Sequence, residues 1–215
     1  MIKITYIFYT TLLLIALVFF IICSLIIYTL PPYIKLKHKG ITTIRGNVST
    51  IEDAAAYLKN KGLKEWELVK EAQRLVAEKM EYSRRNNWDT ADRAFARGMG
   101  YCQQQAEALK HILKEVGIDA RLVQCTRNMF PPKKIHEYYS EGGICGHTWL
   151  RVRINGEEMD VCPGNINNEP GKIHFEVRGK ITNYSGIIKV FGHLGSALMN
   201  TVWDKKAKRK AKIRQ

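Results

Sequence analysis

Residues 102–116 read CQQQAEALKHILKEV, and this segment is the most informative part of the sequence. Its apolar residues recur at helical spacing along one stripe: Ala106, Leu109, Leu113 and Val116. Gly117 follows at a position where helices commonly end. Cys102 therefore lies in the first turn of a predicted helix, where free backbone N–H groups stabilise a thiolate. A small buried hydrophobic residue is the competing interpretation for such a cysteine.

Two further helices are predicted upstream of this segment. Ser49 begins the pattern S-T-I-E, a capping box that opens a helix through about Leu58. The second helix follows Gly62, with apolar residues on one face: Trp66, Val69, Val76 and Met80. Residues 83–100 are predicted to be irregular, ending in a glycine pair that permits a sharp turn or a close approach to a ligand.

Downstream, the pattern changes from helices to strands. Residues 120–125 are rich in β-forming side chains, and residues 147–154 alternate apolar with polar ones. Asn155-Gly156 is a strong hairpin signal, so the chain is predicted to return antiparallel through Cys162. A two-residue turn places Asp160 opposite Arg151 and on the same sheet face as His147. A bulge is needed to bring Asp160 level with His147.

Cys102, His147 and Asp160 occur in this order along the chain. A cysteine at a helix start and two groups on neighbouring strands match the logic of nucleophile, base and orienting residue. The structural alternatives are a solvated strand histidine and an ion pair of Asp160 with Arg151, worth under about 1 kcal/mol. Asn165 is the substitute for Asp160, because the predicted register places its neighbour opposite His147.

Four motifs resemble the transglutaminase-like superfamily, whose papain-like core runs cysteine, histidine, aspartate. They are Gly100-Tyr-Cys102, Gly117-Ile-Asp-Ala-Arg121, His147-Thr-Trp149 and Asp160-Val161. The resemblance covers Glu65 to Pro163, and it implies Cys102 as nucleophile, His147 as general base and acid, and Asp160 as the group that orients the imidazole. The interval from Asn155-Gly156 to Asp160 resembles the family pattern with two residues missing.

The expected fold is α+β, with a papain/transglutaminase-like core of helices packed on an antiparallel sheet, preceded by one transmembrane helix. The expected units are an N-terminal transmembrane anchor, a basic linker, a transglutaminase-like domain and a basic C-terminal tail: residues 1–34, 35–48, 49–203 and 204–215.

The anchor is predicted because residues 4–30 contain no charged side chain. At about 1.5 Å per residue, such a helix exceeds the ~30 Å hydrocarbon core of a bilayer. A cleaved signal peptide is the alternative, although its apolar region is usually about 7 to 15 residues. Pro31-Pro32 is predicted to end the helix. Flanking lysines concentrate after the helix, which favours a single-pass membrane protein with a cytoplasmic C-terminal domain.

Composition narrows the class of protein and its partners. With 215 residues, 46% of them hydrophobic, the chain is neither a disulfide-stapled miniprotein nor disordered. Seven basic residues lie in 205–214 (KKAKRKAKIR), a tail expected outside the folded core. Anionic lipid is its expected partner, with a disordered solubilising end as the alternative. Nucleic acid is not expected, because no aromatic residues interleave the basic run.

The predicted function is a membrane-anchored cysteine enzyme that acts on amide bonds of a protein or peptide substrate through an acyl-enzyme intermediate. Transfer to water describes a peptidase, amidase or deamidase, and transfer to an amine describes a transglutaminase. No metal or other cofactor is expected, because the histidines and cysteines lack zinc-ligand spacing. The alternative is a catalytically inactive transglutaminase-like interaction module at the membrane surface.

Overall fold

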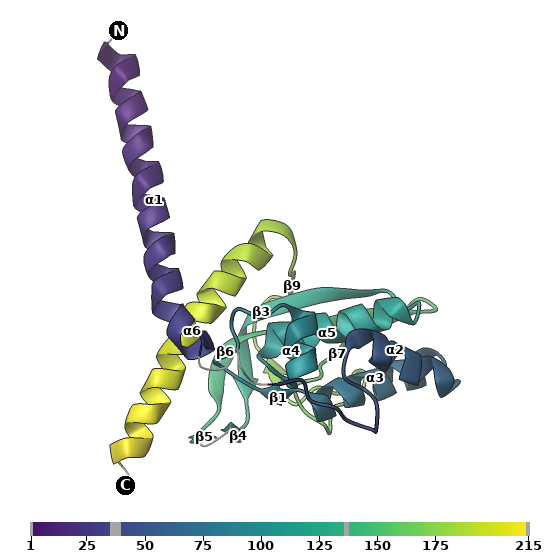
Figure 1. Cartoon of the computed structure of the whole chain (residues 1–215). Helices are drawn as coiled ribbons and strands as arrows, with labels where there is room; N and C mark the ends of the chain where they lie inside the picture. The colour runs from purple at the N-terminus through teal and green to yellow at the C-terminus, as the bar shows by residue number, and fades with distance from the viewer. Residues whose placement is uncertain (1, 35–39, 136–137, 214–215) are drawn as a thin grey trace.

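The computed structural model describes residues 2–34, 40–135 and 138–213. Two long helices, α1 (Ile2–Ile34) and α6 (Gly186–Ile213), cross beside a domain in which short helices pack on an antiparallel sheet (Figure 1). The α+β class expected from the sequence is confirmed.

The helical half of the domain contains the three helices predicted from the sequence and one that was not predicted. They are α2 (Ile51–Asn60), α3 (Glu65–Lys79), α4 (Ala91–Arg97) and α5 (Cys102–Glu115). The capping box of α2 uses Thr50 and Asp53, one residue later than the predicted box at Ser49. The unpredicted α4 lies within residues 83–100, where an irregular segment was expected, and Thr90 caps its amino end.

The main core forms where the apolar stripe of α5 meets α2, α3 and one face of the sheet. Leu109 and Leu113 are fully buried, as the helical spacing predicts. They pack in one cluster with Leu150 and Val152 of the sheet and with Val76 of α3. Burial of these apolar side chains fixes the position of α5, and so of its first residue, against the sheet.

The five-stranded sheet is antiparallel throughout. Its strands are β3 (Ala120–Phe130), β6 (Gly143–Ile154), β7 (Glu157–Val161), β8 (Glu176–Val177) and β9 (Thr182–Asn183). Their order is β7-β6-β3-β8, and β9 pairs with the other end of β3. Two minor sheets pair β1 (Glu81–Tyr82) with β2 (Met99–Gly100) and β4 (Lys133–Ile135) with β5 (Tyr138–Ser140).

The hairpin between β6 and β7 has the predicted register. Asn155 and Gly156 both have positive φ, 51° and 86°, as a type I′ turn requires. Arg151 therefore pairs with Asp160 across the two strands. Strand β6 is longer than predicted, because it begins at Gly143 rather than at the predicted start of the strand.

The segments around α1 differ from the sequence-based expectation. The helix continues through Pro31-Pro32 to Ile34, so the prolines do not end it. Residues 35–39 of the predicted basic linker lie outside the described residues. Its later part belongs to the packed domain, because Val48 is fully buried and Arg45 forms ion pairs with α3.

The predicted basic tail is the carboxyl-terminal part of α6 rather than a disordered end. Lys205, Lys206 and Arg209 are exposed on this helix, whereas Arg214 lies outside the described residues. Asp204, the first residue assigned to the tail, is instead buried and accepts a hydrogen bond from the Arg85 guanidinium. Packing of α6 thus extends to Asp204.

Candidate active site

Cys102 is the first residue of α5 and is half-buried. Burial raises the pKa of its thiol to about 11, although the backbone N–H groups of Thr148, Gln103 and Cys102 itself oppose this effect. The sulfur therefore lies among several N–H donors, as predicted for a helix start, yet the thiol form dominates at neutral pH.

Polar side chains that the sequence analysis did not single out hold the start of α5 in place. The Gln104 amide donates to the carbonyls of Asn86 and Asp89 at 2.6 and 2.7 Å. The Gln105 amide donates to the carbonyl of Met80 at 2.8 Å. The run of glutamines after the cysteine was the available signal, because buried amides need partners and so fix the backbone around them.

His147 lies in β6 and is 8% exposed. Aromatic rings surround the imidazole: Phe130, Trp149, His174 and Phe175. Burial, together with the positive charges of protonated His174 and of Lys133, lowers the pKa of His147 to about 3. The imidazole is therefore neutral at pH 7.

The imidazole is paired with a thiol. His147 Nε2 lies 3.3 Å from the Sγ of Cys162, which directly follows β7. Cys162 is buried, and this burial raises the pKa of its thiol to about 12. The ring and the sulfur are therefore both uncharged at neutral pH.

Asp160, the predicted orienting residue, forms its contacts elsewhere. Its carboxylate accepts a hydrogen bond of 2.8 Å from the Arg151 guanidinium, the cross-strand pair that the register predicts. No hydrogen bond joins Asp160 to His147 within the described part of the chain. Asn165, the predicted substitute, accepts a hydrogen bond from the backbone N–H of Asn167. The orienting role thus stays a prediction for both residues, without a contact to the imidazole.

Cys102 lies against the backbone of β6 next to His147. The N–H that faces the Cys102 sulfur belongs to Thr148, the residue after His147. This position lies beyond the last β6–β7 pair, which joins Leu150 to Val161. The imidazole clusters with Trp149 on one sheet face, whereas α5 packs on the other. In the ranges that the structure describes, no hydrogen bond joins the sulfur to the imidazole.

Helix α6 covers the other side of the α5 start. The Tyr101 hydroxyl is hydrogen-bonded to Nδ1 of His193 at 2.7 Å, and the Tyr184 hydroxyl donates to the Gln103 side chain at 3.0 Å. These contacts flank Cys102 on both sides in the sequence. Among residues 2–34, 40–135 and 138–213, no group of three or more His, Cys, Asp or Glu side chains is placed to hold a metal ion.

Comparison with known proteins identifies the domain. Residues 52–158 match the family model described as the transglutaminase-like superfamily. Cys102 and His147 lie inside the matched residues, and Asp160 and Cys162 follow directly after them. No curated protein matches the chain.

Proposed function

Because the domain that contains residues 52–158 belongs to the transglutaminase-like superfamily, we propose that this chain is a cysteine-dependent enzyme that acts on amide bonds. The observation that carries the proposal is the position of the Cys102 sulfur, which faces backbone N–H groups at the start of α5 and beside His147. Such groups stabilise both a thiolate and the oxyanion of an acyl-transfer intermediate.

In the proposed reaction His147 accepts the thiol proton of Cys102, and the sulfur attacks the amide carbonyl carbon. The N–H groups around the sulfur stabilise the negative oxygen that forms. The imidazolium then gives its proton to the leaving amine as the carbon–nitrogen bond breaks, which leaves a thioester. Water or a second amine, deprotonated by the same imidazole, attacks the thioester and restores the thiol. The substrate is a protein or peptide amide.

This mechanism requires the imidazole to leave Cys162 and to come within hydrogen-bond reach of the Cys102 sulfur when substrate binds, because the described residues show the ring paired with Cys162. The Cys162 thiol supports the resting orientation of the ring through its contact with Nε2. In this proposal Cys162 therefore takes the position that the sequence assigned to Asp160.

One observation favours the second candidate function, an inactive interaction module. A thiol, unlike a carboxylate, supplies no charge to stabilise the imidazolium against the burial that lowers the pKa of His147. A domain that retains the fold without catalysis would tolerate such a pairing.

Alkylation of the cysteines separates the two functions. The full chain in detergent micelles is treated with iodoacetamide at pH 7, and labelling is followed by mass spectrometry. For an enzyme we expect Cys102 to react faster than Cys145 and Cys162, and His147→Ala to slow it by about tenfold or more, because proton removal is lost. The control His174→Ala removes a neighbouring ring and should leave the rate within about twofold. Equal labelling of all cysteines would support the module.

We also propose that α1 anchors the chain in a membrane. Its segment Ile7–Pro31 is long and apolar enough to span a bilayer, and its side chains are mostly exposed, with Thr29 near its end buried. The Lys205 ammonium lies 3.6 Å from the ring centroid of Tyr28, close to the end of this segment. A cation at that level favours anionic headgroups as the lipid partner of the basic tail. Carbonate extraction should leave the full chain, with its amino terminus intact, in the membrane pellet. Release of a shortened chain would indicate a signal peptide instead.

A further inference from the structure

The first turns of α6 expose apolar side chains. Ile187, Val190 and Phe191 are 71%, 59% and 66% exposed. Lys189 is the only charged residue in the sequence from 186 to 203, and its ammonium pairs with a carboxylate of α5. Soluble proteins rarely leave such an apolar cluster in water, so these turns need a covering partner.

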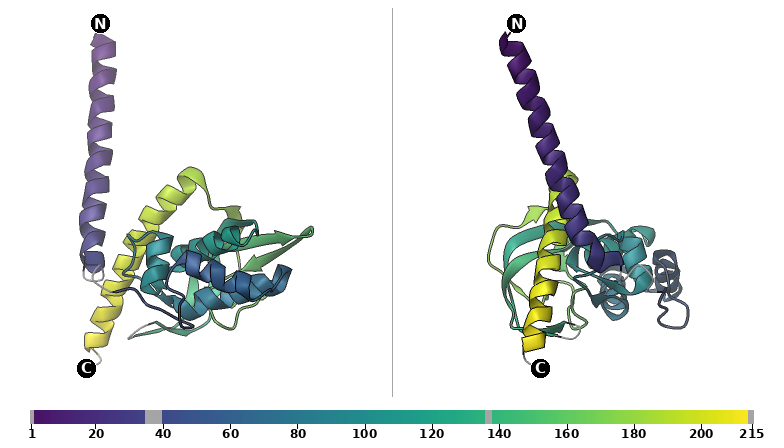
Figure 2. Two further views of the ribbon diagram at one scale, coloured as in Figure 1. Left: turned by 45° about the vertical axis from the view of Figure 1, so that its right-hand side comes forward. Right: turned by 60° about the vertical axis from the view of Figure 1, so that its left-hand side comes forward.

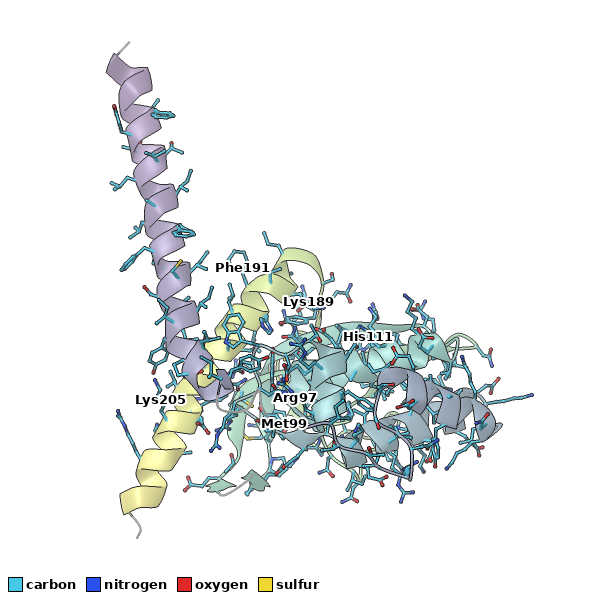
Figure 3. All side chains as sticks on the ribbon, viewed as in Figure 1. Arg97, Met99, His111, Lys189, Phe191 and Lys205 are labelled. Carbon is cyan, nitrogen blue, oxygen red and sulfur yellow. The ribbon has the colours of Figure 1, made fainter. Side chains whose placement is uncertain are left out.

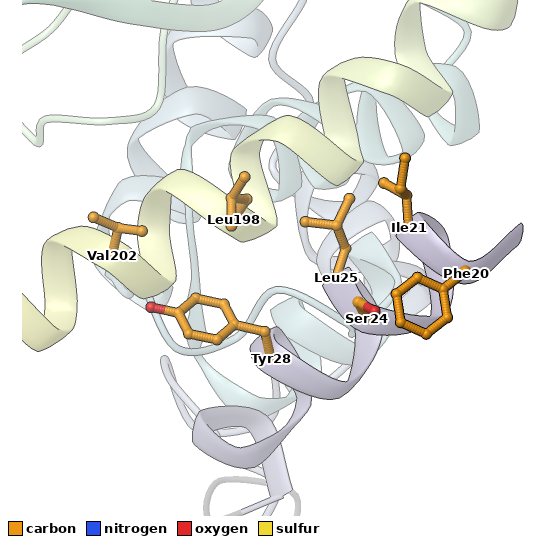
Figure 4. Close-up of a pocket in the computed structure, with 7 residues that line it drawn as sticks. All are labelled: Phe20, Ile21, Ser24, Leu25, Tyr28, Leu198 and Val202. Carbon is orange, nitrogen blue, oxygen red and sulfur yellow. The ribbon is translucent and has the colours of Figure 1, made fainter. Parts of the chain in front are cut away.

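Helix α6 runs beside α1 in the same direction. The Lys205 ammonium lies over the ring of Tyr28. Earlier on both helices, Leu198 lines a groove together with Ile21 and Leu25 (Figure 4). Residue numbers therefore increase in the same direction along the two helices. Their amino-terminal ends point to the same side of the domain, as the views of Figure 1 and Figure 2 show.

The exposed turns lie on the side towards which α1 extends. Figure 3 labels Phe191 on the part of α6 that rises beside the lower half of α1, and Lys205 near the lower end of α1. When Ile7–Pro31 spans a bilayer, Phe191 is directed to the membrane and the basic tail away from it.

The groove between the two helices is also suited to lipid. Its volume is about 560 Å³, and it is open to the surface (Figure 4). Phe20 and Leu25 of α1 and Leu198 and Val202 of α6 give it mainly apolar walls. A lipid acyl chain fits such a lining, whereas water finds few hydrogen-bond partners there.

We propose that the exposed turns of α6, Ile187 to Phe191, insert into the bilayer that α1 crosses. The occupant of this surface is the boundary between headgroups and acyl chains, where interfacial helices bury their apolar face by about 5–10 Å. Of the described helices, α1 alone qualifies as a membrane span, and α6 leads away from the membrane after Phe191, so only the first turns of α6 enter this boundary. The inference rests on the proposed anchor and extends it from a tether to a two-point attachment.

Membrane contact of α6 bears directly on the candidate site. The helix contacts Tyr101 through His193, and the segment before it contacts Gln103 through Tyr184. These two residues flank Cys102, so a domain held by α6 presents the start of α5 close to the bilayer surface.

Photo-crosslinking tests the inference in the full chain. A benzophenone amino acid replaces Phe191, the chain is reconstituted into phosphatidylcholine–phosphatidylglycerol vesicles, and adducts are identified by mass spectrometry after irradiation. The same substitution at Phe20 of α1 is the positive control. Substitution at Ile166, which is 46% exposed between β7 and β8, is the matched control for an apolar residue outside α6. All three side chains are exposed, so the fold should tolerate each replacement.

The expected result is a lipid-adduct yield at Phe191 within about threefold of that at Phe20 and at least about tenfold above that at Ile166. Lipid adducts at Phe20 with none at Phe191 would overturn the inference and leave the anchor intact. Crosslinked dimers at Phe191 would show that a second copy covers α6. Absence of lipid adducts at Phe20 would overturn the anchor itself, and the inference with it.

Discussion

Replacing Cys162 with aspartate should raise the pKa of His147 by about three units. The thiol that contacts Nε2 at 3.3 Å is neutral, because burial raises its pKa to about 12. A carboxylate about 4 Å from an imidazolium contributes about 4 kcal/mol at the effective dielectric constant of protein sites, which corresponds to about three pKa units. The pKa of His147 would therefore move from about 3 to about 6, close to the working range of a general base.

The buried position also penalises the new carboxylate. Cys162 is 1% exposed, so desolvation disfavours ionisation of an aspartate there. Two groups oppose this cost. The backbone N–H of Gly164 already approaches the Cys162 sulfur at 3.4 Å, and the Lys133 ammonium donates to the carbonyl oxygen of Gly164. We therefore expect the aspartate to ionise together with protonation of His147, as a coupled pair.

Imidazole NMR titration of the full chain in micelles measures this change. Cys162→Asn is the matched control, because it has the size and polarity of aspartate without its charge. We expect His147 to titrate near pH 6 in Cys162→Asp and below pH 4 in Cys162→Asn, with the increase following from the Coulomb energy above. Identical titration in the two variants would refute the reasoning, because the carboxylate at position 162 would then have no effect on the pKa of His147.

The remaining predictions concern the predicted third residue, acid stability and the end of α6. Asp160→Ala should leave the iodoacetamide rate of Cys102 within about twofold and reduce the free energy of unfolding by at most about 1 kcal/mol, because its partner is a part-exposed guanidinium; a tenfold slower rate would restore its predicted role. The pKa of His147 is lower in the folded chain than its ordinary value of 6.5, so the unfolded chain binds more protons. Stability should fall between pH 6.5 and about 3 in urea titrations, by about 1.4 kcal/mol per pH unit from His147, with a further loss from His174, whose pKa burial lowers to about 4; His147→Asn should reduce this slope. Asp204→Ala should lower Tm by roughly 3–10 °C, because it removes a buried ion-pair partner, whereas a chain that ends at Lys206 should keep its Tm; the opposite order would place the stability in the basic tail.

The elements predicted correctly are those whose local pattern agrees with the tertiary fold. The stripe of α5 is apolar at helical spacing and is buried, and Asn155-Gly156 forms the predicted turn. Both signals arise from residues close in sequence. They fix the register of β6 and β7, which places Arg151 opposite Asp160.

The elements that were missed depend on distant partners. The short helix α4 buries Ala91, Ala94 and Phe95. Three buried residues are too few to show a clear helical periodicity in the sequence. Helix α6 has glycines in its first half and is held by contacts from elsewhere in the chain, such as the hydrogen bond between Asn200 and Asn87. Propensity and periodicity carry no information about such long-range pairs.

The third residue of the site shows how residue type and geometry can point to different positions. Asp160 was predicted because a carboxylate orients imidazoles in triads, although its register places it beside Arg151. The interval from Asn155-Gly156 to Asp160 is two residues shorter than in the family pattern. Cys162 lies two residues after Asp160, on the same sheet face and nearer to His147. Position 162 was not singled out from the sequence, because the predicted register placed position 164 opposite His147 and made Asn165 the substitute. Burial lowers the pKa of His147, and the side chain at position 162 determines whether a negative charge opposes this effect.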